Sequence, residues 1–163
     1  MIGIFYGSST GNTESLANEI AARLGVAPSD VYNVGSASAD AVAAYDTLLL
    51  GSSTWGVGDL QDDWESFVGK LAKENLSGKK VGFFGCGNSG SFPDTFCDAL
   101  GIIRDELSGT GCTFIGNMDA SGYPVTDSRA FDGGNVIGLL ADDDEPDKTE
   151  ERTEAWVQTI KNS

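Results

Sequence analysis

Residues 2–13 read Ile-Gly-Ile-Phe-Tyr-Gly-Ser-Ser-Thr-Gly-Asn-Thr. The run Ile2–Tyr6 has the length and apolar character of a strand, and a helix-like stretch, Glu14–Leu24, follows the last six residues. Backbone N–H groups at a helix N-terminus converge on an anion and the helix dipole favours it, so the hydroxyl-rich loop between them predicts a phosphate site without Lys or Arg. The Gly-Lys-Ser/Thr of a nucleoside triphosphate loop is missing, so we expect a monoester phosphate.

Strand-like and helix-like segments alternate along the rest of the chain. Apolar residues at helical spacing predict helices around Trp64–Leu71, Phe96–Leu107 and Arg152–Ile160, and a short helix within Ser36–Ala44. The other apolar runs of strand length are Val31–Val34, Thr47–Leu50, Val81–Phe84 and Cys112–Ile115. Because buried parallel strands are almost continuously apolar and each crossover needs a helix, the pattern predicts an α/β fold. We expect a doubly wound, five-stranded parallel sheet with helices on both faces.

Ligands of such sheets bind at the carboxyl ends of the strands. The loops predicted at that edge are Gly7–Thr13, Gly51–Gly58 and Gly85–Phe92. The stretch Asn117–Val136 is long for a simple connection, and we interpret it as a long insertion near strand five.

Length and charge limit the classes of function. The 163 residues predict a single domain, 1–163, and the formal net charge of −15 disfavours nucleic acid and favours a basic protein surface. We expect no membrane insertion and a cytoplasmic protein, because apolar runs are short and no leader pattern precedes the first strand. The plastid stroma is the alternative if this is a mature chain.

Cysteine, histidine and acidic residues give little support to metal or thiol chemistry. The three cysteines show no Cys-x-x-Cys spacing, and Cys86 and Cys112 adjoin apolar runs, which favours packing over a dithiol role. The chain has no histidine, which counts against hydrolytic and metal-based catalysis. The run Asp142–Glu145 lacks the glycine and the spacing of a calcium loop, so we interpret it as a solvated acidic turn.

Two aromatic residues stand among small residues in the second and third loops. Trp55 follows a buried strand, and Pro93 biases Phe92 toward an extended backbone. Rings from two loops could enclose a planar ligand, and the neighbouring glycines would let backbone N–H groups approach its heteroatoms. A core position is the alternative for each ring, and an ordinary capped turn is the alternative for Ser8–Thr13.

Taken together in this order, these motifs resemble those of the flavodoxin family, and specifically the long-chain group. Ser8–Thr13 is similar to the family's phosphate loop, Thr54–Gly58 to its flavin-stacking loop and Gly85–Gly101 to its second isoalloxazine loop. The segments Ser128–Phe131 and Val136–Leu139 resemble the insertion that divides strand five in that group. The similarity runs from Ile2 to Ile160.

This resemblance implies strand order 2-1-3-4-5 and a noncovalently bound FMN that serves a low-potential one-electron carrier rather than an enzyme. It implies phosphate contacts from the first loop and Thr54, with Trp55 and Phe92 on opposite flavin faces; relatives usually have Tyr at the Phe92 position. The full set of implied cofactor-binding residues is Ser8, Ser9, Thr10, Gly11, Asn12, Thr13, Ser53, Thr54, Trp55, Gly56, Val57, Gly58, Cys86, Gly87, Asn88, Phe92 and Cys97.

The implied partners are basic redox proteins such as ferredoxin–NADP reductase, photosystem I, or a nitrogenase-type or pyruvate-oxidising system. The protein itself is expected to be a monomer. Acidic residues expected around the flavin edge would steer them: Asp59, Asp62, Asp63, Glu65, Asp94 and Asp98. An FMN-dependent NAD(P)H:quinone reductase of the same fold is the alternative. Against it, Phe92 should cover the flavin face where a nicotinamide would bind, and the sequence has no basic cluster to bind a nucleotide phosphate. A ligand-free signalling module, such as a response-regulator receiver, is the third possible function. The aromatic residues in the two loops count against it.

Overall fold

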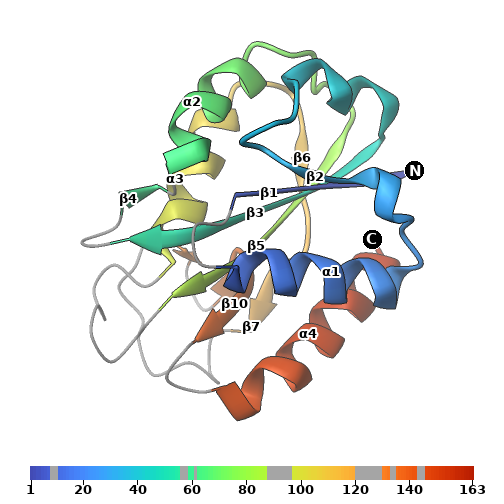
Figure 1. The fold of residues 1–163 in the computed structure, drawn as a ribbon, viewed down its shortest axis with the longest axis vertical. Coiled ribbons are helices and arrows are strands. Elements are labelled where there is room, and N and C mark those ends of the chain that lie inside the picture. The colour runs from blue at the N-terminus through green and yellow to red at the C-terminus, as the bar shows by residue number, and fades with distance from the viewer. Residues whose placement is uncertain are drawn as a thin grey trace.

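The computed structural model describes residues 1–7, 11–55, 59–60, 62–87, 97–119, 130–132, 135–142 and 146–163. A parallel sheet runs through its centre in the order β10-β5-β3-β1-β2 (Figure 1). These strands are β1 (Ile2–Gly7), β2 (Val31–Asn33), β3 (Thr47–Trp55), β5 (Lys80–Gly87) and β10 (Gly138–Asp142). Every neighbouring pair along this path is parallel, so the predicted doubly wound sheet and its order 2-1-3-4-5 are confirmed.

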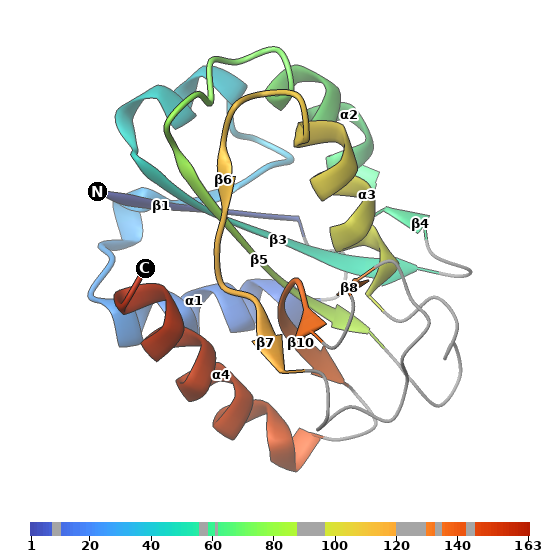
Figure 2. The same ribbon diagram turned by 180° about the vertical axis from the view of Figure 1, so that it is seen from behind.

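Helices cover both faces of the sheet (Figures 1 and 2). The helices are α1 (Asn12–Leu24), α2 (Asp62–Leu71), α3 (Asp98–Leu107) and α4 (Pro146–Lys161), with 3₁₀ turns η1 (Pro28–Asp30) and η2 (Ala39–Ala44). Helices α1 and α4 pack with Ile4, Leu49 and Phe84 on one face. Helices α2 and α3 pack with Phe5 and Phe83 on the other, because successive side chains of a strand point to opposite faces. The predicted short helix within Ser36–Ala44 is the 3₁₀ turn η2.

Strand five is assembled from two separate segments. Strand β6 (Thr113–Phe114) pairs with Lys80 and Val81 at the start of β5, and β10 pairs with Phe83–Gly87 farther along it. The predicted strand Cys112–Ile115 is therefore only the first half. Gly138 and Leu139, which we assigned to the insertion, belong to the main sheet.

The segment between β6 and β10 forms a small sheet of its own. Its order is β7-β9-β8, with β7 (Met118–Asp119), β8 (Phe131–Asp132) and β9 (Asn135–Val136), and all pairs are antiparallel. Ala130, Val136 and Ile137 are buried in the core that also contains α2 and α3. The insertion therefore contributes to the core of the protein.

Two strands are longer than the sequence predicted. Strand β3 continues to Trp55, where it pairs with the antiparallel β4 (Asp59–Leu60), and β5 continues to Gly87. The glycines that we interpreted as the start of loops lie inside strands, because Gly51 pairs with β1 and β5 and Gly85 pairs with β3 and β10. Neighbouring groups leave no room for a side chain at either position. A Cβ at Gly51 would lie 2.1 Å from Cε2 of Phe84, and one at Gly85 would lie 2.4 Å from the carbonyl oxygen of Ser52.

A helix that spans a bilayer needs about 20 mostly apolar residues. Within the described ranges, no helix is both long enough and apolar enough to cross a membrane.

Candidate functional site

The carboxyl ends of the central strands meet at one edge of the sheet, which we call the carboxyl edge. The register sets Gly7 beside Ser52, Ser53 beside Cys86, and Gly87 beside Asp142. The chain segments predicted to bind a ligand follow β1, β3 and β5, so all three leave from this edge. This is where doubly wound sheets bind their ligands.

Helix α1 begins at the carboxyl edge with a glycine. Gly11 is the N-cap residue and has φ +92°, in the left-handed region that favours glycine. A Cβ at Gly11 would meet nothing within 4 Å, so the first turn of α1 opens onto free space among the described residues. Thr13, two residues later, is fully buried. A helix N-terminus of this kind suits a phosphate, because its backbone N–H groups and its dipole both attract an anion.

Helix α3 begins at the same edge on the opposite face of the sheet, with an unusual backbone. Its N-cap residue Cys97 has φ 57°, which is uncommon for a residue with a side chain. The Cys97 side chain is buried, and its carbonyl oxygen accepts a hydrogen bond from the N–H of Leu100. Strained backbone of this type is concentrated at binding sites, where the rest of the fold holds it in place.

Two carboxylates that we predicted to be solvated are buried instead. Asp142 is the last residue of β10 and is 1% exposed, so it does not belong to an acidic turn. Asp98 is only 7% exposed, so it does not contribute to an exposed docking face. It is the first residue of α3, where the positive end of the helix dipole stabilises a carboxylate. Residues 143–145 lie outside the described part of the chain.

The other acidic residues predicted around the flavin edge divide into two groups. Glu65 is exposed on α2, whereas Asp63 is partly buried with its carboxylate against Gly35, 2.9 Å from where a Cβ would stand. Of the remaining three, Asp59 has its backbone in β4 and Asp62 begins α2, but their side chains and all of Asp94 lie outside the described residues. Glu65 is thus the described member that can meet a partner directly.

The predicted cofactor residues divide in the same way. Those described at or beside the carboxyl edge are Gly11, Asn12, Thr13, Cys86, Gly87 and Cys97. Ser53, Thr54 and Trp55 are described by their backbone at the end of β3. The residues that lie outside the described part are Ser8, Ser9, Thr10, Gly56, Val57, Gly58, Asn88 and Phe92. The fold brings the described members to one edge, and the contacts of all of them with a flavin stay predictions.

Sequence reasoning missed the contact that holds α2 against this edge. Trp64 belongs to the apolar residues at helical spacing that predicted this helix, and it is fully buried. Its indole Nε1–H also donates a hydrogen bond of 2.6 Å to the carbonyl oxygen of Gly51 on β3. A buried indole N–H usually has a partner, which is the signal that could have indicated this contact. Its effect is to anchor α2 to the strand that ends at Trp55.

The three cysteines pack in or against the core, as the sequence predicted for Cys86 and Cys112. Cys86 and Cys97 are buried and Cys112 is partly buried; all three are free. Cys86 packs in the core beneath α1 and α4, and Cys112 packs against the core beneath α2 and α3. Among the described residues, no group of three or more His, Cys, Asp or Glu side chains could hold a metal ion.

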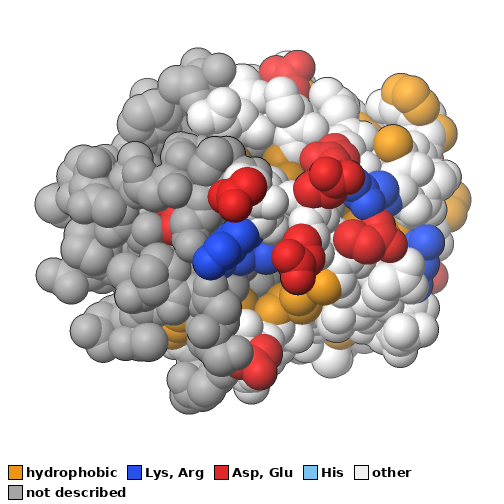
Figure 3. Space-filling model, turned by 90° about the horizontal axis from the view of Figure 1, so that it is seen from below, with side chains coloured by type: hydrophobic (Ala, Val, Ile, Leu, Met, Phe, Trp, Pro, Cys, Tyr) orange, Lys and Arg blue, Asp and Glu red, His pale blue; other side chains and the backbone are white. Residues whose placement is uncertain are grey.

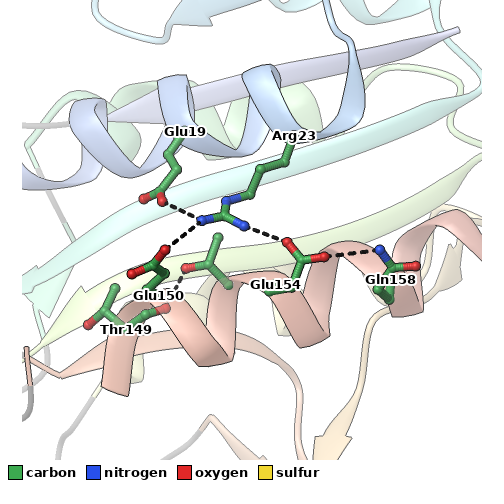
Figure 4. A network of polar contacts seen from close by, with 7 residues as sticks. Glu19, Arg23, Thr149, Glu150, Glu154 and Gln158 are labelled. Carbon is green, nitrogen blue, oxygen red and sulfur yellow. Dashed lines mark hydrogen bonds and ion pairs between the residues drawn. The ribbon is translucent and has the colours of Figure 1, made fainter. Parts of the chain in front are cut away.

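Acidic and basic side chains lie next to one another on the face formed largely by α4 (Figure 3). Arg23 on α1 links the two helices there, with ion pairs to Glu150 and Glu154 on α4 and to Glu19 on its own helix (Figure 4). A hydrogen bond from Gln158, and then the Arg23 guanidinium, lower the pKa of Glu154. This network fastens α4 to the helix whose N-terminus lies at the carboxyl edge.

Comparison with known proteins agrees with this architecture. The sequence profile of flavodoxins matches residues 4–156. The chain is 42% identical over 160 residues to flavodoxin 1 of Escherichia coli K12 (97% of this chain, 91% of that protein) and 41% identical over 162 residues to a flavodoxin of Klebsiella pneumoniae (98% and 92%). The crystal structure of a Fusobacterium nucleatum flavodoxin bound to flavin mononucleotide superimposes with a TM-score of 0.88 at 28% identity, covering 99% of this chain and 96% of that one. The chain therefore belongs to the flavodoxin family, whose members are electron-transfer flavoproteins rather than enzymes.

Proposed function

We propose that the chain is a single FMN-binding domain, residues 1–163, that carries one electron at a time at low potential between redox proteins. The observation that carries the proposal is the start of α1, where the left-handed N-cap Gly11 places the first turn at the carboxyl edge and no described residue beyond its chain neighbours lies within 4 Å of where its Cβ would stand. The backbone N–H groups and the dipole at this helix N-terminus can bind one terminal phosphate group. A solved flavodoxin of very similar fold holds flavin mononucleotide, which supports the same cofactor here.

When bound, FMN supplies reversible one-electron redox chemistry. The residues proposed to hold its phosphate are Ser8–Thr13 and Thr54, and backbone groups of residues 56–58, 86–88 and 97 would contact the ring. Trp55 and Phe92 would cover the two ring faces and exclude water from them. The strained backbone at Cys97 supports a role at the site, because such strain is retained where a neighbouring loop must hold a ligand.

The proposed partners are basic electron donors and acceptors such as ferredoxin–NADP reductase, photosystem I, or a nitrogenase-type or pyruvate-oxidising system, met by a cytoplasmic monomer. The net charge of −15 and the exposed Glu65 support this proposal, because complementary charge accelerates encounter. Membership of the flavodoxin family counts against the alternative of a quinone reductase.

Titration of the apoprotein with FMN and with riboflavin tests the cofactor proposal. We expect FMN to bind far more tightly, because riboflavin lacks the phosphate that the first turn of α1 would hold. Gly11→Ala should weaken FMN binding by about 1–3 kcal/mol, because alanine disfavours φ +92° and the first turn of α1 would relax away from the conformation that presents its N–H groups to the phosphate. Riboflavin binding should stay nearly unchanged.

Gly25→Ala is the matched control, since Gly25 caps the other end of α1 at φ 72° and also has open space around it. Its effect on FMN affinity should be small. Riboflavin binding as tight as FMN, or equal losses in both variants, would remove the assigned role of the first loop.

A further inference from the structure

A continuous row of aromatic rings crosses the protein beneath α2. Trp64 and Phe67 of α2 meet edge to face with their ring centroids 5.3 Å apart, and Phe67 lies 6.2 Å from Phe5 of β1. Phe5 stacks on Tyr32 of β2 at 4.7 Å, and Tyr32 lies 6.0 Å from Tyr45, the residue that ends η2. The row therefore joins Trp64, anchored to the strand that leads to Trp55, with a tyrosine pair at the far end.

The tyrosine end of the row carries a proton acceptor. The Tyr45 hydroxyl donates a hydrogen bond of 2.8 Å to Oδ1 of Asp30, and the hydroxyl oxygens of Tyr45 and Tyr32 are also 2.8 Å apart. Tyr45 is 3% exposed, whereas Asp30 is only partly buried and is in contact with water. Burial, followed by the hydrogen bonds with Tyr32 and Asp30, raises the pKa of Tyr45, so this phenol is protonated at neutral pH. Loss of an electron from Tyr45 would thus be accompanied by transfer of its proton to Asp30.

The tryptophan end has the opposite character. Trp64 is fully buried, and its Nε1–H donates to the carbonyl oxygen of Gly51, which is far too weak a base to take the proton. An oxidised Trp64 would therefore keep its proton as a radical cation. A cation in an apolar setting is poorly solvated, so an electron drawn from another group relieves an unfavourable charge.

We propose that Tyr45 is a redox-active tyrosine that collects oxidising equivalents from Trp64. A one-electron oxidant of the radical class removes an electron from Trp64, and an electron from Tyr45 then restores the indole. In the same step the Tyr45 hydroxyl proton moves to Asp30, which leaves a neutral tyrosyl radical and a protonated carboxyl group. One electron and one proton leave Tyr45, and the oxidant is reduced by one electron overall.

Packing accounts for the rings, and the buried Tyr45 hydroxyl needs a hydrogen-bond acceptor of some kind; Asp30 is an acceptor that can also take the proton. Phe5 and Phe67 are too hard to oxidise to hold the radical, and they serve as the close-packed path from Trp64 to the tyrosine pair. The Phe5 ring centroid lies 4.7 Å from that of Tyr32 and 6.1 Å from that of Tyr45. The carboxylate of Asp30 adds little to an apolar core, yet it stands at hydrogen-bond distance from the one buried phenol of the row. The Tyr32 hydroxyl lies where it can donate to the Tyr45 oxygen and stabilise the radical. The row leads away from the carboxyl edge, so the radical would come to rest away from a bound cofactor.

Pulse radiolysis of the purified protein with azidyl radicals, which oxidise tryptophan, tests this proposal. We expect the tryptophan radical to decay as a tyrosyl radical forms, observed by transient absorption and by freeze-quench electron paramagnetic resonance. Trp64→Phe should abolish this transfer phase, and Tyr45→Phe should remove most of the tyrosyl signal. Tyr6→Phe is the matched control and should leave it intact, because Tyr6 packs in the core on the opposite face of the sheet.

Asp30→Asn keeps a hydrogen-bond acceptor beside Tyr45 but removes the base. It should slow formation of the tyrosyl radical by about 100-fold, at the lower end of what a positioned base contributes, and should abolish the solvent deuterium isotope effect of the wild-type protein. This variant is conservative, so it also decides the question if Tyr45→Phe unfolds. An equal tyrosyl yield in Tyr45→Phe, or an unchanged rate and isotope effect in Asp30→Asn, would overturn the proposal. The oxidant is supplied externally, so the result is separate from that of the FMN titration.

Discussion

Single glycines determine how closely the strands and their neighbours approach one another. Gly51 leaves room for the ring of Phe84, and Gly138 lies where strand five resumes beside β5. A Cβ at Gly138 would lie 2.0 Å from the carbonyl oxygen of Phe83, which is a backbone atom within the sheet and cannot move aside cheaply. Position therefore decides what a glycine contributes here, since the same residue type on an exposed helix only costs conformational entropy.

Two alanine substitutions should show this difference. Gly138→Ala should lower the free energy of unfolding by about 1–3 kcal/mol, because the sheet must shift to accept the methyl group. Gly69→Ala on α2 should raise it by about 0.5–1 kcal/mol, because Gly69 is exposed, has nothing within 4 Å of a Cβ, and is a poor helix former. Urea unfolding measures both changes. Equal unfolding midpoints for the two variants would contradict this account of Gly138.

At the scale of elements, polar contacts supplement the apolar contacts that hold α1 and α4 side by side. The apolar stripes of both helices pack against the same sheet face, and Arg23 adds ion pairs across the helix surfaces to Glu150 and Glu154. Exposed pairs contribute little singly, but one guanidinium shared among three carboxylates forms a network.

Arg23→Gln should lower the melting temperature at low salt, and the difference from wild type should shrink in 1 M salt because screening weakens exposed pairs. The pKa of Glu154 is lowered in the folded state, so its contribution is present above the unfolded pKa and is lost as the pH falls through the folded value. The difference should therefore also shrink below about pH 4. Lys73→Gln is a control with the same change of charge. A salt-independent difference would assign the effect of Arg23 to packing.

The insertion packs as part of the protein's core. Its residues Ala130, Val136 and Ile137 are buried among the side chains of the core beneath α2 and α3. The N–H of Ile137 donates to the carbonyl oxygen of Ala130, which closes the segment just before β10 begins. The split of strand five and the small sheet thus form one packed unit at the edge of the main sheet.

At the scale of the whole molecule, net charge should influence how the protein meets the partners proposed for it. The formal net charge is −15, and acidic side chains around the carboxyl edge would lie close to a docked basic protein. Because Asp98 is buried, part of the predicted acidic face stabilises α3 rather than attracting a partner.

Reduction by a basic reductase should become slower as ionic strength rises from about 0.1 M to about 1 M, since the Debye length falls from ~10 Å to ~3 Å. Stopped-flow measurement of the second-order rate constant tests this. Glu65→Gln should make the dependence shallower, whereas Glu106→Gln, an exposed position near the other end of α3, should not. Equal slopes for both variants and wild type would show that steering does not depend on the carboxyl edge.

The sequence by itself determined the features that local physics controls. The apolar runs and helical stripes predicted the alternation of strands and helices, the parallel sheet and the three segments at its carboxyl edge. The motifs in those segments, matched to a known family, predicted the strand order and the cofactor. The tertiary structure decided what depends on residues far apart in the chain. Gly51 is a strand residue because it pairs with β1 and β5 on its two sides, and it is a glycine because Phe84 occupies the space of a side chain. Asp98 and Asp142 are buried because they are the first residue of α3 and the last residue of β10, two elements that pack in the core. The division of strand five was implied by the family resemblance, but the register was not: only the structure shows that Thr113 and Phe114 pair with the start of β5 and Gly138–Asp142 with the rest of it.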